Sequence, residues 1–103
     1  MRVHPISCRR PGRLTPPQAV GLRAGVVTLP TGGVMDWHST LGKEELLVML
    51  EGRVRLQVRA PRRTRQVPLR AGQCAWLPPR TAHRVVNHSA ASARYVYVTA
   101  KAR

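Results

Sequence analysis

Acidic side chains are scarce in this 103-residue sequence. Four Asp and Glu residues stand against 18 Lys and Arg residues, of which only two are lysine, and the formal net charge is +14. Phenylalanine is absent and isoleucine occurs once. Arginine in place of lysine, with little Ile or Phe, is typical of the codon bias of a GC-rich genome. That bias does not account for the scarcity of acidic residues. The composition is therefore also compatible with a surface that attracts phosphates or other anions.

Long apolar runs are missing as well. No stretch approaches the roughly 20 apolar residues that span a bilayer, and the first residues lack the apolar segment of a signal peptide. We therefore expect a cytoplasmic protein with no membrane partner. The length suffices for one compact domain and leaves too little apolar surface for a second core.

Cysteine occurs only at Cys8 and Cys74, without a CxxC pair or the spacing of a zinc knuckle. This excludes a disulfide framework and predicts two free thiols. Because Cys74 lies in an apolar stretch, we expect it to be a small buried hydrophobe.

Proline and glycine divide the chain. Residues 1–18 contain four prolines and little periodicity, which predicts an N-terminal arm or irregular lead-in, and residues 19–103 are expected to form a barrel. The expected strands in this second region are Val20–Leu29, Val34–His38, Glu45–Leu50, Val54–Arg59, Thr64–Leu69, Cys74–Leu77, His83–Asn87 and Tyr95–Thr99. Eight short strands without a helical period predict an all-β, single-domain jelly roll or small barrel.

One expected strand alternates clearly between apolar and polar residues. Val54, Leu56 and Val58 share one face, while the intervening arginines and Gln57 share the other, so one face should pack in the core. The arginines of this region form a cluster, namely Arg53, Arg55, Arg59, Arg62, Arg63 and Arg65. Such a cluster is most simply a solvated face, which would bind nucleic acid weakly and without sequence specificity.

The segment from Gly32 to Gly52 carries the first recognisable motif. It contains Gly32, five residues, His38, one residue, Thr40, four residues, Glu45, six residues and Gly52. This resembles the first motif of the cupin family, in which a second His stands where this chain has Thr40.

The segment from Gly72 to Asn87 resembles the second cupin motif. Gly72, Pro78, His83 and Asn87 stand at the spacing of that motif, and only Arg80 departs, at a position where the family has Gly. Two motifs in the right order imply a double-stranded β-helix, the cupin jelly-roll barrel, made of antiparallel strands. Small cupins of this kind commonly pair, so a homodimer is expected, with the arm and the edge strands as its contacts.

The resemblance also implies a metal site formed by His38, Glu45 and His83. Strand parity allows these side chains to point into one interior, and two imidazoles with one carboxylate suit divalent Fe, Mn, Ni, Zn or Cu. Thr40 leaves an additional open position, so weaker metal binding is expected. Two alternatives stay open: Glu44 would replace Glu45 after a one-residue shift, and Asp36 would be an oxygen ligand on the face of His38.

Other residues are candidates for the pocket around the metal. They are Thr40, Met49, Glu51, Trp76 and Asn87, of which Thr40 or Glu51 would position a substrate. Trp37 and Trp76 are expected in the core or the pocket wall. His4 and His88 are expected to be solvated or packed.

These features leave three functions open. The first is a metal-binding cupin that holds a small polar or anionic molecule, with or without turnover. The second is an enzyme, either a non-haem metal-dependent dioxygenase or a sugar isomerase, for which the sequence names no general base. The third is a metal-free binding protein or nucleic-acid accessory protein that uses the arginine-rich face.

Overall fold

A computed structural model of the protein describes residue 3 and residues 5–102. His4, expected to be solvated or packed, lies outside the described residues. The chain forms β1 (Gly12–Arg13), β2 (Leu22–Leu29), β3 (Val34–Ser39), β4 (Lys43–Glu51), β5 (Arg53–Arg59), β6 (Thr64–Arg70), β7 (Cys74–Leu77), β8 (Ala82–Val86) and β9 (Ala93–Lys101). In this described part no helix capable of crossing a membrane occurs.

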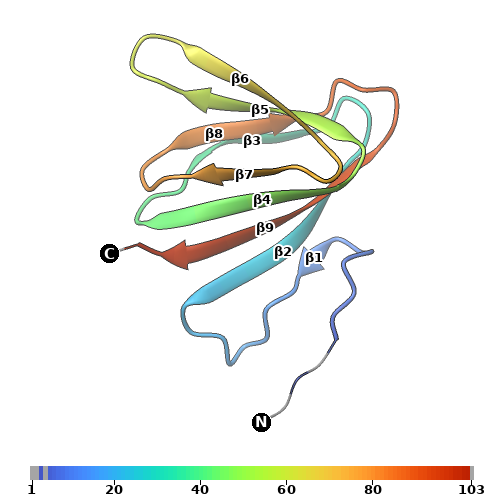
Figure 1. Ribbon diagram of the computed structural model, residues 1–103, viewed down its shortest axis with the longest axis vertical. Coiled ribbons are helices and arrows are strands. Elements are labelled where there is room, and N and C mark those ends of the chain that lie inside the picture. Colours follow the sequence, from blue (N-terminus) through green and yellow to red (C-terminus); the bar gives the residue numbers. More distant parts are fainter. Residues whose placement is uncertain (1–2, 4, 103) are drawn as a thin grey trace.

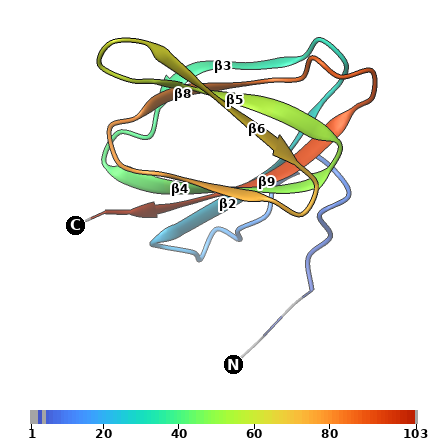
Figure 2. The same cartoon turned by 45° about the horizontal axis from the view of Figure 1, so that its top comes forward.

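The strands form two antiparallel sheets. One has the order β1-β2-β9-β4-β7 and the other the order β3-β8-β5-β6. Figure 1 shows the succession of strands, and Figure 2 shows the two sheets as facing layers. The sequence-based prediction of an all-β jelly-roll barrel is therefore confirmed.

The core lies between the inner faces of the two sheets. Its buried members are Leu29, Leu47, Met49, Val54, Leu56, Leu69, Leu77, Val85, Ala93 and Tyr95. The alternation expected along β5 holds for Val54 and Leu56. Gln57 differs, because it is buried although it lies on the outer face, where its amide nitrogen donates to Gln66 Oε1 at 3.1 Å. The neighbouring Arg84 covers it and donates to its carbonyl oxygen.

The proline-rich arm contains one element that its composition did not predict. Gly12 and Arg13 form β1, which pairs with Val26 and Gly25 at the edge of the five-stranded sheet. Its partner strand β2 runs beside β9 along its whole length. The arm therefore continues a sheet that reaches one mouth of the barrel.

Cys74 is exposed, which corrects the expectation of a buried thiol. It pairs with Val48 at the start of β7, and Leu77, three residues later, faces the core. Odd and even positions of a strand face opposite sides, so Cys74 lies on the outer face. The apolar segment around it showed no alternation from which this could be read.

Two turn positions explain the glycines of the motifs. Gly52 has φ of 75°, and a Cβ there would lie 2.6 Å from the backbone oxygen of Ser92, so both conformation and space require glycine. Arg80, which replaces the Gly of the second motif, also has positive φ, 56°. This arginine keeps the turn that the family makes with glycine, at the cost of a conformation that L-residues disfavour.

Candidate metal centre

A β-bulge in β3 aims His38 into the barrel. Met35 pairs with Val85 and His38 pairs with His83, so one extra residue lies between these two positions of β3. Strict alternation would place Met35 and His38 on opposite faces, and the bulge allows both to face inward. As a result the rings of His38 and His83 lie 4.2 Å apart, centroid to centroid.

The same bulge removes Asp36 from the face of His38. Its carboxylate accepts a hydrogen bond from the backbone N–H of Trp37 at 2.7 Å, and it is not part of the metal-ligand cluster. Trp37 is directed to the outside, where the guanidinium carbons of Arg59 and Arg84 lie 4.7 and 5.2 Å from its ring centroid. Neither the oxygen-ligand role of Asp36, which assumed regular alternation along β3, nor a core position of Trp37 agrees with this arrangement.

Glu45, and not Glu44, faces the histidines. It lies on the inner face of β4, is 8% exposed, and places Oε2 3.5 Å from His83 Nε2. Glu44 faces outward and accepts a hydrogen bond from Trp76 Nε1 at 3.1 Å. The structure thus separates two neighbours that the motif spacing alone distinguished.

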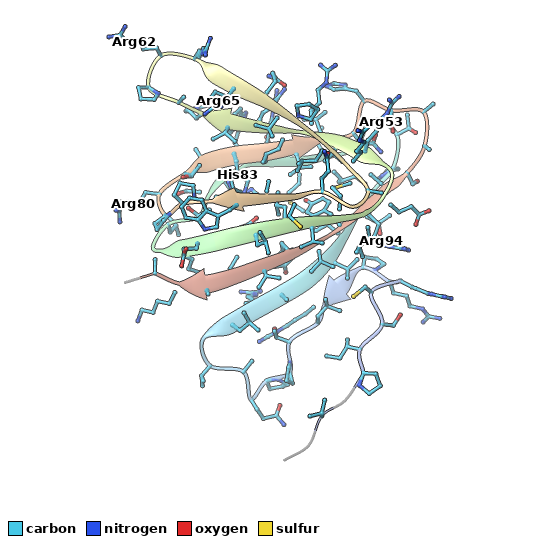
Figure 3. The ribbon with its side chains drawn as sticks, viewed as in Figure 1. Arg53, Arg62, Arg65, Arg80, His83 and Arg94 are labelled. Carbon is cyan, nitrogen blue, oxygen red and sulfur yellow. The ribbon has the colours of Figure 1, made fainter. Side chains whose placement is uncertain are left out.

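His38, Glu45 and His83 form a compact set of ligand atoms. One atom of each lies within 4.8 Å of the others, with His38 exposed at the cavity side and the other two buried. Figure 3 labels His83 on β8. The three predicted ligands come from β3, β4 and β8, so both sheets contribute to the site.

Both imidazoles are oriented by a backbone carbonyl two residues earlier in the chain. His38 Nδ1 lies 2.8 Å from the carbonyl oxygen of Asp36, and His83 Nδ1 lies 3.0 Å from that of Thr81. A carbonyl only accepts, so each Nδ1 donates its N–H, and Nε2 is the nitrogen left to bind a metal. This is the hydrogen-bonding pattern of metal-ligating histidines.

The environment of His83 Nε2 fits a cation. This atom is buried and has no hydrogen-bond partner within the described residues, and 3.5 Å is long for a hydrogen bond to Glu45. Burial lowers the pKa of His83, but the contact with Glu45, the Thr81 carbonyl and the charge of Glu45 together raise the pKa above its ordinary value. An imidazole lone pair beside a buried carboxylate is a donor set for a divalent transition metal.

Thr40 lines the cavity but its hydroxyl is already engaged. Oγ1 donates to the carbonyl of Pro78 at 2.8 Å and accepts from the backbone N–H of Thr81 at 3.0 Å. Thr40 therefore ties the end of β3 to the segment that leads into β8. The motif comparison identified the position and did not reveal this structural role.

The other four pocket candidates lie elsewhere. Met49 is a core residue, 2% exposed, and Asn87 is fully buried and donates to the carbonyls of Leu29 and Ala91. Glu51 is exposed and pairs with Arg94 at 3.1 Å. Trp76 is 59% exposed on the outer face of β7. Of the five candidates, only Thr40 lines the cavity of the ligand cluster.

The ligand cluster opens into a cavity of about 810 Å³. Its walls include Val27, Met35, Val85, Tyr95 and Tyr97, and its mouth includes Arg13, Arg23, Lys43 and Lys101. Burial and the charge of Glu45 raise the pKa of Tyr95, so this phenol stays protonated. Sequence analysis missed the cations at the mouth, although Lys43 stands two residues before Glu45 and so shares its face.

Gly25 makes room for Tyr97 in this wall. A Cβ at Gly25 would lie 2.5 Å from the phenolic oxygen of Tyr97 and 2.6 Å from its ring. The two residues are register partners on β2 and β9. Tyr97 therefore rests directly over the backbone of β2.

Comparison with known proteins agrees with this architecture. The sequence profile described as "Cupin domain" matches residues 25–99. No curated protein sequence matches the chain. A Cupin 2 conserved barrel domain protein from Salinispora arenicola CNS-205 is similar in structure, with a TM-score of 0.77 and 22% identity, covering 99% of this chain and 90% of that one.

Two further solved structures are larger than this chain. The Cnp3 cupin domain of Schizosaccharomyces pombe has a TM-score of 0.77 at 18% identity, covering 88% of this chain and 63% of that one. Oxalate oxidase in complex with the substrate analogue glycolate has a TM-score of 0.73 at 18% identity, covering 79% of this chain and 42% of that one. These likenesses show the fold, and the profile match covers most of the chain. The protein belongs to the cupin family.

Proposed function

We propose that this protein is a metal-binding cupin that holds a small anionic molecule in its barrel beside a divalent transition metal. One observation carries the proposal. Two imidazoles, each fixed through Nδ1 by a backbone carbonyl, present Nε2 toward one buried carboxylate. Without a metal, the buried His83 Nε2 makes no hydrogen bond within the described residues and has only the Glu45 carboxylate, at 3.5 Å, beside it.

His38, Glu45 and His83 would hold the metal. Two nitrogens and one carboxylate oxygen suit Fe, Mn, Ni, Zn or Cu, and three protein ligands leave coordination positions for water or a bound molecule. A metal bound there would supply Lewis-acid polarisation of an oxygen atom. The chain's own contribution is to orient both imidazoles and to keep the ligands in a cavity walled by Tyr95 and Tyr97.

The charges at the mouth support an anionic occupant. Lys43 and Lys101 are register partners on β4 and β9, and Arg23 lies on the same inner face of β2. Like charges directly opposite each other are unfavourable, and an anion between them removes the repulsion. Glycolate, a small carboxylate, occupies the similar oxalate oxidase, which agrees with this ligand class.

Turnover is a second candidate function, and the ligand set favours it. Two His and one carboxylate with open positions is the arrangement of non-haem iron oxygenases. An oxygen-dependent reaction on a small carboxylate would therefore use the same centre. Oxygen consumption by iron-loaded and zinc-loaded protein in the presence of small carboxylates tests this function.

Metal content is the direct test of the principal proposal. Elemental analysis of purified protein, followed by calorimetric titration of the chelator-treated protein with Ni(II) or Mn(II), should give one site per chain. His83→Ala should lose that site, whereas His88→Ala, which removes an exposed histidine outside the cluster, should keep it. Equal titration of both variants would refute the metal site, and mass spectrometry of the extracted ligand would test the anion.

The homodimer predicted from the sequence gains support from the outer face of the five-stranded sheet. Two rows of uncharged residues cross its strands in register, Trp76–Leu46–Val98 and Cys74–Val48–Val96. Trp76 and Leu46 are exposed. Since a net charge of +14 repels a second copy, this uncharged face is where two copies are expected to meet.

A further inference from the structure

A second concave site lies on the outside of the four-stranded sheet. This groove, of about 520 Å³, is lined by Arg53, Arg55, Arg70, Gln73, His88 and Ser89, with Pro68 beside them. It shares no lining residue with the cavity of the metal centre. Figure 3 shows Arg53 at the opposite end of the β5–β6 hairpin from Arg62 and Arg65.

The groove brings like charges together. Arg53 on β5 and Arg70 on β6 are direct register partners, and Arg55 follows two residues later on the same face of β5. Like charges directly opposite each other destabilise a strand pair. An anion between the two guanidinium groups would reduce the repulsion between them.

None of the four Asp and Glu side chains neutralises the groove. Glu45 faces His83 and Glu51 pairs with Arg94. Glu44 accepts from Trp76, and Asp36 accepts from the N–H of Trp37. Within residues 3 and 5–102, the side chains of the three groove arginines form no ion pair or hydrogen bond.

The other end of the same sheet differs, because two of its arginines are engaged and those of the hairpin tip lie outside the groove. Arg59 and Arg84 lie over the ring of Trp37, and Arg84 also donates to Gln57. The guanidinium groups at the groove are therefore available to a ligand, whereas those near Trp37 already make contacts within the protein. This contrast distinguishes a site from a uniformly basic surface.

We propose that this groove binds the phosphate group of a small phosphate monoester. Arg forks match phosphate oxygens in bidentate fashion. The amide of Gln73 accepts from the backbone N–H of Arg70 at 3.0 Å, and the NH₂ of the same amide adds two donors. A monoester carries about −1.5 to −2 at pH 7, whereas each phosphate of nucleic acid carries one negative charge. Three guanidinium groups around one concavity therefore suit the monoester better than an extended chain.

The test uses inorganic phosphate and phenyl phosphate as probes, titrated at constant ionic strength into ¹⁵N-labelled, chelator-treated protein. Saturable shifts confined to the amides of Arg53, Arg70, Gln73 and Ser89 are expected. The double variant Arg53→Gln/Arg70→Gln should bind at least about tenfold more weakly. Arg62→Gln/Arg63→Gln, which removes the same charge from the exposed hairpin tip, should bind as the wild type does.

Three results would overturn the proposal. Shifts at all arginine-bearing strands without saturation, or equal weakening in both double variants, would show a diffuse ion atmosphere only. A dT₁₂ oligonucleotide that binds through Arg53 and Arg70 more tightly per phosphate than phenyl phosphate, at the same ionic strength, would assign the groove to nucleic acid instead. Circular dichroism of each variant confirms folding, which is expected because the substituted side chains are exposed.

Discussion

His83 Nε2 and Glu45 Oε2 face each other at 3.5 Å inside the barrel, on strands from opposite sheets. Each atom is a metal ligand by its chemistry, and neither reaches the other as a good hydrogen-bond partner. A proton on His83 or a metal ion between the two atoms would therefore link the two sheets electrostatically.

Replacing Thr40 tests the open ligand position. Thr40→His should bind Ni(II) more tightly than Thr40→Val, by about tenfold or more, because it adds a third imidazole where the family motif has one. The valine variant is the matched control, since both substitutions lose the hydroxyl bridge between Pro78 and Thr81, at a cost of about 1–3 kcal/mol. Calorimetry on both folded variants decides, and equal affinities would place Thr40 outside the coordination sphere.

Metal affinity should fall as the pH falls. A ligating imidazole must be unprotonated, and the raised pKa of His83 means that protons compete with the metal already near neutral pH. We expect weaker Ni(II) binding at pH 6 than at pH 8, measured by calorimetry in matched ionic strength. A flat profile over this range would contradict a ligand role for His83.

The folding stability of the metal-free protein should fall as the pH rises. A pKa raised in the folded state stabilises the protein below the unfolded-state pKa, and this contribution is lost as the pH rises through the folded-state pKa. Urea unfolding of wild type and His83→Gln at pH 5.5 and 8.5 isolates the effect. The wild type should lose more stability toward pH 8.5 than the variant, and parallel curves would argue against the His83–Glu45 interaction.

Arg80→Gly should stabilise the protein slightly. The left-handed φ of 56° costs an L-residue about 1–2 kcal/mol, and the greater freedom of glycine in the unfolded chain offsets about 0.4–1 kcal/mol of that. Arg80→Ala keeps the strain and should bring no gain. Denaturant midpoints of the two variants measure the difference, and a loss of stability in the glycine variant would point to a contact of the Arg80 side chain.

Gly25→Ala should destabilise the cavity wall by about 1–3 kcal/mol, because the new methyl group overlaps the ring of Tyr97. In the background of Tyr97→Ala the same substitution should cost much less. This double-mutant cycle is read from thermal or denaturant unfolding. Equal costs in both backgrounds would mean that β2 shifts instead of the ring.

Leu46→Lys should weaken self-association by placing a charge in the middle of the uncharged rows. Sedimentation at micromolar concentration should show twice the 11.5 kDa chain mass for wild type and the chain mass for the variant. Thr64→Lys adds the same charge on the exposed outer face of the other sheet and should leave the dimer intact. A wild-type monomer would remove the basis of the dimer proposal.

Spacing within the two motifs was sufficient to predict the barrel and the clustering of His38, Glu45 and His83. The prediction of which side chains face inward failed where a strand has a bulge or where its sequence does not alternate between apolar and polar residues. The bulge after Met35 moves Asp36 off the face of His38, and a bulge leaves no mark in composition. The stretch from Cys74 to Leu77 is apolar throughout, so only its pairing with β4 shows that Trp76 faces outward.

The mouth of the metal cavity lies partly outside the region that defines the family. Residues 25–99 match the cupin profile, whereas Arg13, Val20, Arg23 and Lys101 border the same cavity from segments on either side of that match. A relative can therefore match the cupin profile and still carry different side chains at this mouth. Grafting residues 12–24 onto another small cupin should transfer ligand preference while metal affinity stays that of the recipient.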